Sequence, residues 1–145
     1  FGKNEMWYVM QADKESELLV GWEKPIDTEG YVNSVSNGTI LDYVHSETVT
    51  KGDTFYIPTG RIHAIGAGTL IAEIQQTSDV TYRVYDYDRI DAKTGQKRDL
   101  HIDEAKDVLD SRRVCLEWAR TSEPPTALAR PSQRKNHRKI IGKIP

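Results

Sequence analysis

The sequence contains little cysteine and no long apolar run. Cys115 is the single cysteine among 145 residues, so no disulfide can form within the chain. Such sparse use is typical of a reducing compartment, and we predict a cytoplasmic location. No stretch approaches the roughly 18 consecutive apolar residues of a membrane-spanning helix. The opening residues also lack the basic, apolar and small-residue order of a secretory signal, so we expect no membrane partner.

Apolar residues are scarce as well, and the charges are unevenly distributed. Hydrophobic residues make up 37% of the chain and charged residues 29%, which indicates that part of the chain lies outside the core. Residues 1–110 contain 11 Lys and Arg against 20 Asp and Glu, a net charge of −9, whereas residues 111–145 contain 9 against 2, a net charge of +7. We predict one domain over residues 1–110 and a basic, weakly ordered tail over residues 111–145.

The basic cluster of this tail suggests at most nonspecific contact with nucleic acid, because it lacks interleaved aromatic residues. We therefore expect no specific nucleic-acid partner.

Short strand-like segments dominate the first 110 residues. Two runs of aromatic and aliphatic residues, separated by the polar stretch ADKES, predict a β-hairpin over residues 5–11 and 17–22. Further strands are predicted, with glycine or proline between them, at residues 46–50, 53–57, 62–65, 69–76 and 80–87. Many short strands at close spacing are typical of an antiparallel sandwich or barrel.

Two segments have helical periodicity instead. Residues 27–44 place apolar groups at helical spacing, with Asp27 and Thr28 as candidate N-caps and Gly38 as a break, which predicts two short helices. Residues 101–111 begin with acidic residues and continue with a periodic apolar face, which predicts a closing amphipathic helix. The predicted fold class is therefore mainly β, with a short helical insert and a C-terminal helix.

One of the four histidines stands in unusual surroundings. Gly52, Pro58 and His63 have the spacing G(x)5P(x)4H, which is the second sequence motif of the cupin barrel. Glycine turns the chain, proline sets a corner, and the histidine then falls on a strand facing the barrel interior, where an imidazole can bind a metal. Ala67 replaces an asparagine of the family pattern. Taken alone, a histidine on an apolar strand is more often a core residue than a metal ligand.

Longer motifs extend this resemblance. The segments GKNEMWY at residues 2–8 and GTLIAEIQQTSDVTYRVYDYDR at residues 68–89, together with the cupin motif, resemble the type I mannose-6-phosphate isomerases from Gly2 to about Asp110. The resemblance implies a partial cupin barrel, also called a double-stranded β-helix or jelly roll. It further implies a zinc-dependent aldose-ketose isomerase that interconverts mannose 6-phosphate and fructose 6-phosphate, so a sugar phosphate is the expected substrate.

The same resemblance assigns roles to five residues. Glu5 and His63 match metal ligands, Lys3 and Glu73 match residues of the substrate pocket, and Arg83 matches the active-site arginine. Isomerisation through a cis-enediol needs a group that moves a proton and a cation that stabilises the developing oxyanion. Arg83 suits the second role, and either Lys3 or Glu73 suits the first. Zinc would serve as a Lewis acid.

Each assignment has a simpler alternative. Lys3 and Glu5 could form a solvent-exposed pair, Arg83 could bridge to Asp86 or Asp88, and Glu73 could be an edge charge. We assign His45, near a loop, and His101, at a helix start, to structural roles.

In the family, two further ligands of the Gln/His-x-His type precede the position of Glu5, so we expect only two of about four protein ligands in this chain. The alternative function is a non-catalytic cupin module that binds a sugar or a metal. The sequence does not indicate an oligomeric state.

Overall fold

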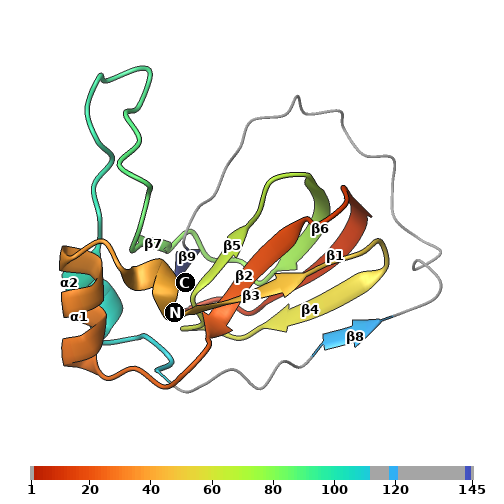
Figure 1. Ribbon diagram of the computed structural model, residues 1–145. Helices are drawn as coiled ribbons and strands as arrows, with labels where there is room; N and C mark the ends of the chain where they lie inside the picture. Colours follow the sequence, from red (N-terminus) through yellow and green to blue (C-terminus); the bar gives the residue numbers. More distant parts are fainter. Residues whose placement is uncertain (1, 112–117, 121–142, 145) are drawn as a thin grey trace.

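The fold is mainly β, as the sequence predicts. The computed structural model describes residues 2–111, 118–120 and 143–144, which form two antiparallel sheets and two short helices (Figure 1). In order, the strands of the first sheet are β6 (Thr69–Gln75), β1 (Glu5–Ala12), β4 (Asp53–Ile57) and β8 (Trp118–Arg120). Those of the second sheet are β3 (Val44–Thr48), β2 (Glu17–Trp22), β5 (His63–Ile65), β9 (Lys143–Ile144) and β7 (Tyr82–Arg83).

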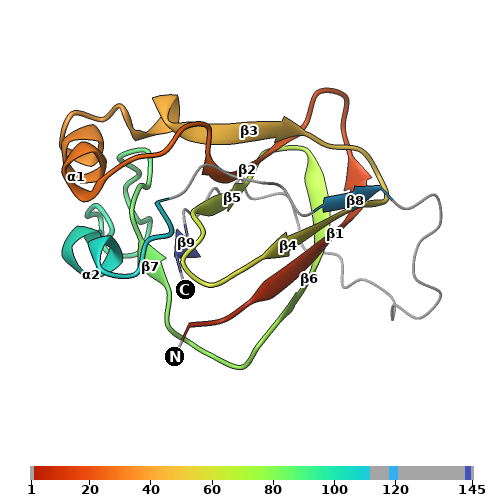
Figure 2. The same cartoon turned by 90° about the horizontal axis from the view of Figure 1, so that it is seen from below.

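The two sheets enclose a core that the strand alternation builds. Every second residue of a strand points to the same face, so one face of each sheet can be apolar. The buried residues of this core come mainly from β1, β2 and β4: Trp7, Val9, Leu18, Val20, Val49, Phe55 and Ile57. Figure 2 shows the two sheets on opposite sides of this core. Full burial of one such side chain is worth about 1.5–3 kcal/mol, so these contacts hold the sheets together.

The predicted hairpin of β1 and β2 is wrong. β1 pairs with β4 and β6, whereas β2 pairs with β3 and β5 in the other sheet. The turn between β1 and β2 forms hydrogen bonds with two other loops. The Asp13 N–H donates to the Gly68 carbonyl, and the Val49 N–H donates to the Ser16 carbonyl. Since both strands carry a bulky apolar face, placing them in opposite sheets buries one face against the other. Local spacing alone does not distinguish this arrangement from a hairpin.

The helical insert follows the sequence closely. Helix α1 (Thr28–Ser36) begins after Asp27, whose Oδ1 accepts a hydrogen bond of 2.7 Å from the Gly30 N–H. Gly38 has a φ of 71°, a conformation that favours glycine, and it separates α1 from the 3-10 turn η1 (Ile40–Asp42). The predicted pair of short helices is therefore confirmed.

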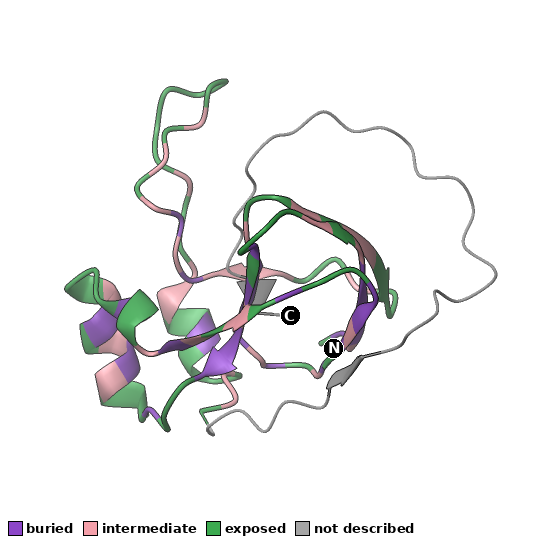
Figure 3. Ribbon diagram, turned by 45° about the vertical axis from the view of Figure 1, so that its right-hand side comes forward, coloured by how far each residue is buried: buried purple, intermediate pink, exposed green. Residues whose placement is uncertain are grey.

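Helix α2 (Ile102–Lys106) is shorter than the predicted helix over residues 101–111. The chain after it turns back toward the sheets, where the Asp110 N–H donates to the Gly60 carbonyl at 2.8 Å. The indole N–H of Trp22 donates to the Asp110 carbonyl at 2.9 Å. The Asp110 N–H, which a longer helix would bond to the carbonyl four residues earlier, is therefore used in a long-range bond. Figure 3 shows buried positions on the helices where they face the strands.

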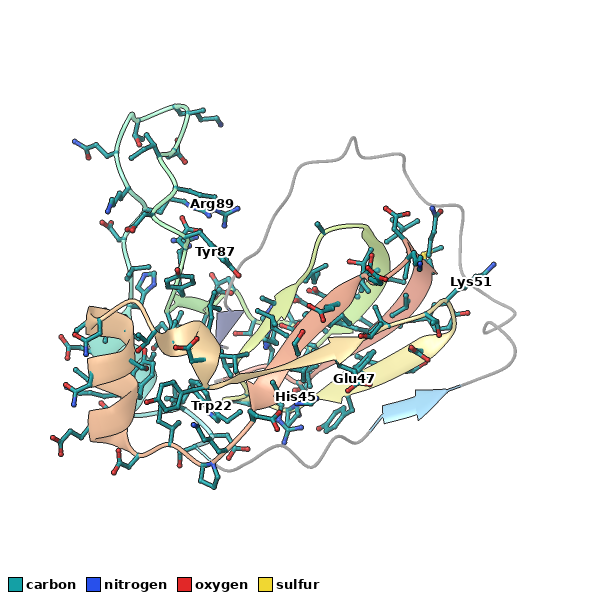
Figure 4. All side chains as sticks on the ribbon, viewed as in Figure 1. Trp22, His45, Glu47, Lys51, Tyr87 and Arg89 are labelled. Carbon is teal, nitrogen blue, oxygen red and sulfur yellow. The ribbon has the colours of Figure 1, made fainter. Side chains whose placement is uncertain are left out.

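The helices pack against the second sheet through a second core, separate from the first. Its buried residues are Trp22, Ile26, Tyr31, Ile40, Val44, Ile62, Val84 and Ala105. Desolvation in this core, followed by the nearby charge of Asp103, raises the pKa of the Tyr31 phenol to about 12. Trp22 lies where β2 meets the helices (Figure 4).

The predicted strand over residues 80–87 is mostly wrong. Only Tyr82 and Arg83 form β7, and Tyr87 and Asp88 have φ angles of 54° and 53°, which strand residues do not adopt. The connection between β7 and α2 instead includes an arm that projects from the body of the protein (Figure 1), while Val84 at its start is buried in the second core. Tyr87 and Arg89 are labelled on it in Figure 4.

Two short strands lie within the predicted tail. β8 pairs with β4, and β9 pairs with β5 and β7. Most of residues 111–145, including Cys115, lies outside the described residues, so the weakly ordered tail stays a prediction. None of the helices in the described part of the chain is long and apolar enough to cross a membrane.

Candidate functional site

Glu5 is the centre of a buried polar cluster at the start of β1. Alternation along β1 places Glu5, Trp7 and Val9 on the inner face, and Glu5 is only 1% exposed. Lys3 Nζ lies 2.8 Å from Glu5 Oε1 and also donates to the side-chain carbonyl of Gln75. The Trp7 indole N–H donates to Glu5 Oε2 at 3.1 Å. Each oxygen of the carboxylate therefore has its own cationic or polar neighbour.

His63 approaches the same carboxylate from the opposite sheet. It is the first residue of β5, is 1% exposed, and pairs with the inward-facing Val20 of β2. Its Nε2 lies 3.7 Å from Glu5 Oε2. Its Nδ1 lies 2.7 Å from the Arg61 carbonyl, and because a carbonyl only accepts, Nδ1 carries a hydrogen. In the neutral ring, the lone pair is then on Nε2, which faces Glu5.

This arrangement fits a divalent metal ion in its donor chemistry. Carboxylate oxygen and imidazole nitrogen are both zinc ligands, with bonds of about 2.0–2.2 Å. Two such bonds at a tetrahedral angle place the ligand atoms roughly 3.3 Å apart, close to the observed 3.7 Å. A backbone carbonyl on the second imidazole nitrogen is also a common feature of metal-ligating histidines. Among the described residues, however, no group of three or more His, Cys, Asp or Glu side chains could hold a metal, so Glu5 and His63 are a partial set.

The alternative of a solvent-exposed Lys3–Glu5 pair is wrong. Lys3 is 2% exposed, and a buried ammonium and carboxylate need each other's charge. Two neighbours of this pair, Trp7 and Gln75, were not predicted from the sequence. Alternation places Trp7 on the same strand face as Glu5, since it follows Glu5 by two positions, but it does not indicate the hydrogen bond between them.

Glu73 lies near this cluster, but within residues 2–111 it forms no hydrogen bond or ion pair with Lys3, Glu5 or His63. In the register of β1 and β6, Glu73 is opposite Trp7 and Gln75 is opposite Glu5, so all four side chains share the inner face. Glu5 and Glu73 are then diagonal neighbours, which are separated by about 7–8 Å. Glu73 is exposed, and β6 is the edge strand of its sheet. This position suits a pocket carboxylate that faces a ligand, and it also suits an edge charge.

Arg83 shares the face of His63 but is two strands away. Both residues pair with the same backbone position of β9, and residues that pair with one position of an intervening antiparallel strand lie on the same face of the sheet. Strands are about 4.8 Å apart, which separates the two Cα atoms by about 10 Å. The structure therefore places Arg83 beside the Lys3–Glu5–His63 cluster and not within it.

The contacts of Arg83 exclude one alternative. Its Nη1 donates to the Asp99 carbonyl at 3.2 Å, and its backbone N–H donates to Nδ1 of His101 at 3.0 Å. Within residues 2–111, Arg83 forms no ion pair with Asp86 or Asp88, so the alternative of a structural bridge to either residue is wrong. Its Nε is buried and has no hydrogen-bond partner among the described residues. A ligand oxygen would satisfy this donor.

Two other histidines have structural contacts. His101 is the N-cap residue of α2, as predicted. His45 lies within β3, whereas the sequence predicted a position near a loop, and its ring contacts Glu23 and Glu47. Partial burial alone would lower the pKa of His45, but these two hydrogen bonds outweigh it and raise the pKa above its usual value. Figure 4 labels His45 and Glu47 on β3.

The chain is similar to known mannose-6-phosphate isomerases. The chain is 47% identical over 108 residues to mannose-6-phosphate isomerase of Streptococcus mutans, covering 74% of this chain and 34% of that protein. It is 39% identical over 109 residues to mannose-6-phosphate isomerase ManA of Bacillus subtilis, covering 75% and 34%. The chain is therefore similar to about one third of each of these mannose-6-phosphate isomerases. No family model matches the chain.

The fold agrees with this relationship. The crystal structure of mannose-6-phosphate isomerase from Bacillus subtilis superimposes with a TM-score of 0.73 at 34% identity, over 79% of this chain and 36% of that one. The architecture is therefore a partial cupin, as the sequence resemblance implies. The chain spans about a third of the length of the mannose-6-phosphate isomerases that it matches.

Proposed function

We propose that the chain carries part of the active site of a zinc-dependent aldose-ketose isomerase acting on mannose 6-phosphate and fructose 6-phosphate. The observation that supports this most is the buried contact of Lys3, Glu5 and His63 within a region that is 38–47% identical to mannose-6-phosphate isomerases. A cytoplasmic location, predicted from the single cysteine, suits the metabolism of sugar phosphates and is part of the proposal.

Glu5 and His63 would hold the metal, which supplies Lewis-acid polarisation of the substrate oxygens. The isomerisation removes a proton from carbon 2 of the aldose, forms a cis-enediol, and returns a proton to carbon 1. Arg83 would stabilise the negative charge that develops on the enediolate oxygen through its Nε–H. Lys3 and Glu73 are the two groups of the inner face that could carry the proton. Lys3 is held by Glu5 and Gln75, whereas Glu73 is exposed to an incoming ligand.

A second candidate function is a cupin module that binds a metal or a sugar without turnover. One observation favours it: the described residues supply two metal ligands, whereas a catalytic zinc site usually has three. With two ligands, the ion would bind weakly and would have several positions open to water.

A zinc measurement and a turnover assay separate the two functions. Zinc affinity, measured by competition with a chelator, should fall in Glu5→Ala and His63→Ala but not in His45→Ala, a histidine outside the cluster. A coupled assay should detect fructose 6-phosphate from mannose 6-phosphate, with kcat about 10²–10³-fold lower in Arg83→Ala, as expected for loss of one oxyanion donor. Lys97→Gln removes an exposed cation of the arm and should leave kcat unchanged. Zinc binding without turnover would support the binding module, and absence of both would contradict the proposed function.

A further inference from the structure

We propose that Trp7 is a positioning residue that fixes the Glu5 carboxylate and the His63 ring in the orientation needed to bind one divalent cation. This inference rests on the metal site of the proposed function. It adds a residue that touches both candidate ligands without being able to ligate a metal itself, since the indole nitrogen is a donor only.

The first part of the argument concerns the carboxylate. Glu5 Oε1 lies 2.8 Å from Lys3 Nζ, and Glu5 Oε2 accepts the Trp7 indole N–H at 3.1 Å. With a partner at each oxygen, the carboxylate plane cannot rotate without breaking one contact. Trp7 is 1% exposed, so water does not replace its N–H if the contact is lost. Oε2, the oxygen that Trp7 holds, is also the oxygen that faces His63.

The second part concerns the imidazole. The rings of Trp7 and His63 are 5.1 Å apart between centroids and inclined at 84°, an edge-to-face arrangement. The Arg61 carbonyl holds the Nδ1 side of the imidazole, and Trp7 packs against the ring from the opposite sheet. The ring therefore has little space in which to turn its Nε2 away from Glu5.

Together these contacts make Trp7 an outer-shell partner of both ligands. Such partners orient ligands before the metal arrives, and their substitution typically weakens metal affinity 10–100-fold. The indole N–H uses one lone pair of Oε2 and leaves another for a cation. We expect loss of this single donor to weaken zinc binding by a similar factor, although no ligand atom is removed.

The chain offers a matched control in Trp22. Trp22 is also 1% exposed and also uses its indole N–H in one hydrogen bond, to the Asp110 carbonyl at 2.9 Å. It belongs to the other core, between the second sheet and the helices. Trp22→Phe and Trp7→Phe therefore make the same chemical change at two equally buried positions, one hydrogen-bonded to Glu5 and one hydrogen-bonded to the Asp110 carbonyl.

The zinc dissociation constant of the full chain is measured by competition with a chelator, and the site geometry by the absorption spectrum of bound Co²⁺. Trp7→Phe should bind zinc 10–100-fold more weakly and shift the Co²⁺ spectrum. Trp22→Phe should match the wild type in both. Equal affinity of Trp7→Phe and the wild type would overturn the inference and leave the proposed metal site intact. Equal weakening in both variants would overturn it too, because general destabilisation would then explain the loss.

A second measurement needs no variant. During zinc titration of the wild type, the indole ¹H–¹⁵N resonance of Trp7 should shift with saturation while that of Trp22 stays in place. A stationary Trp7 resonance in a zinc-saturated protein would overturn the inference. A wild-type chain that takes up no zinc would overturn both this role and the metal site on which it depends.

Discussion

Lys3 and Glu5 neutralise each other inside the sandwich, where their side chains are 3% and 0% exposed. Burial of two charges is tolerated only because they are paired, so the pair stabilises the fold only while both members are present.

We predict that Lys3→Met, assayed without metal, lowers the free energy of unfolding by about 3–5 kcal/mol, because it leaves a buried carboxylate without its cation. Adding Glu5→Leu should recover most of that loss. Lys14→Met is the control, since Lys14 pairs with Glu15 at the surface, where both side chains are more than 80% exposed. Urea unfolding measures all of these variants. An equal effect of Lys3→Met and Lys14→Met would contradict the buried pair.

A second prediction concerns Gly60, at the corner between β4 and β5. A Cβ added there would lie 2.4 Å from the backbone carbonyl oxygen of Val108, and Gly60 has a φ of 84°. Gly38 has a similar φ of 71°, but nothing lies within 4 Å of its added Cβ. Both Ala variants should incur the backbone strain, and Gly60→Ala should lose about 1–3 kcal/mol more because of the clash. Equal losses in urea unfolding would mean that the close approach to Val108 relaxes freely.

A third prediction concerns the pH dependence of stability at His45. Only the charged imidazole donates to both Glu23 and Glu47, which is why the pKa of His45 is raised in the folded protein. The resulting stability is fully present below the unfolded pKa of about 6.5 and is lost as the pH rises through the folded pKa. The free energy of unfolding of the wild type should therefore exceed that of His45→Gln by more at pH 5.5 than at pH 9. The change should be no more than about 1 kcal/mol at this partly exposed site, and urea unfolding at the two pH values measures it. A difference that does not change with pH would contradict the charged bridge.

A fourth prediction concerns the base of the arm. Asp86 is 5% exposed and accepts hydrogen bonds from Arg89 at 2.6 Å and from Arg98 Nε at 2.7 Å. Burial would raise the pKa of Asp86, but these two arginines outweigh it and lower the pKa. Asp86→Asn should loosen the arm and speed its cleavage by trypsin, about tenfold for each 1.4 kcal/mol lost. Asp88→Asn, which breaks only the exposed pair with Lys97, should change the cleavage rate little.

The same interaction gives the arm a dependence on pH. Because the folded pKa of Asp86 is lowered, its contribution is present above the unfolded pKa of about 3.9 and is lost as the pH falls through the folded value. A protease that is active in acid should therefore cleave the arm of the wild type faster only at strongly acidic pH.

The sequence predicted the elements of this fold better than their partners. Alternation and glycine spacing located β4, β5 and β6, and Asp27 marked the start of α1, because these signals act within a few residues. The pairing of β1 was missed, since its partners β4 and β6 are distant in the chain and a polar turn is compatible with more than one connection.

The candidate site shows the same division. The cupin motif spacing singled out His63 and the family resemblance singled out Glu5, and the structure brings them within 3.7 Å of each other. Nothing in the local pattern indicated that Trp7 donates to Glu5 Oε2, because that contact depends on rotamers fixed by the surrounding core. The predicted strand through Tyr87 and Asp88 failed for a related reason: the Asp86 ion pairs stabilise a backbone that alternation does not anticipate.

Glu5 and His63 belong to different sheets. A cation bound by both residues would therefore link the two sheets at one end of the sandwich. Zinc binding would then stabilise the folded protein against unfolding. The melting temperature should therefore rise with the logarithm of the zinc concentration.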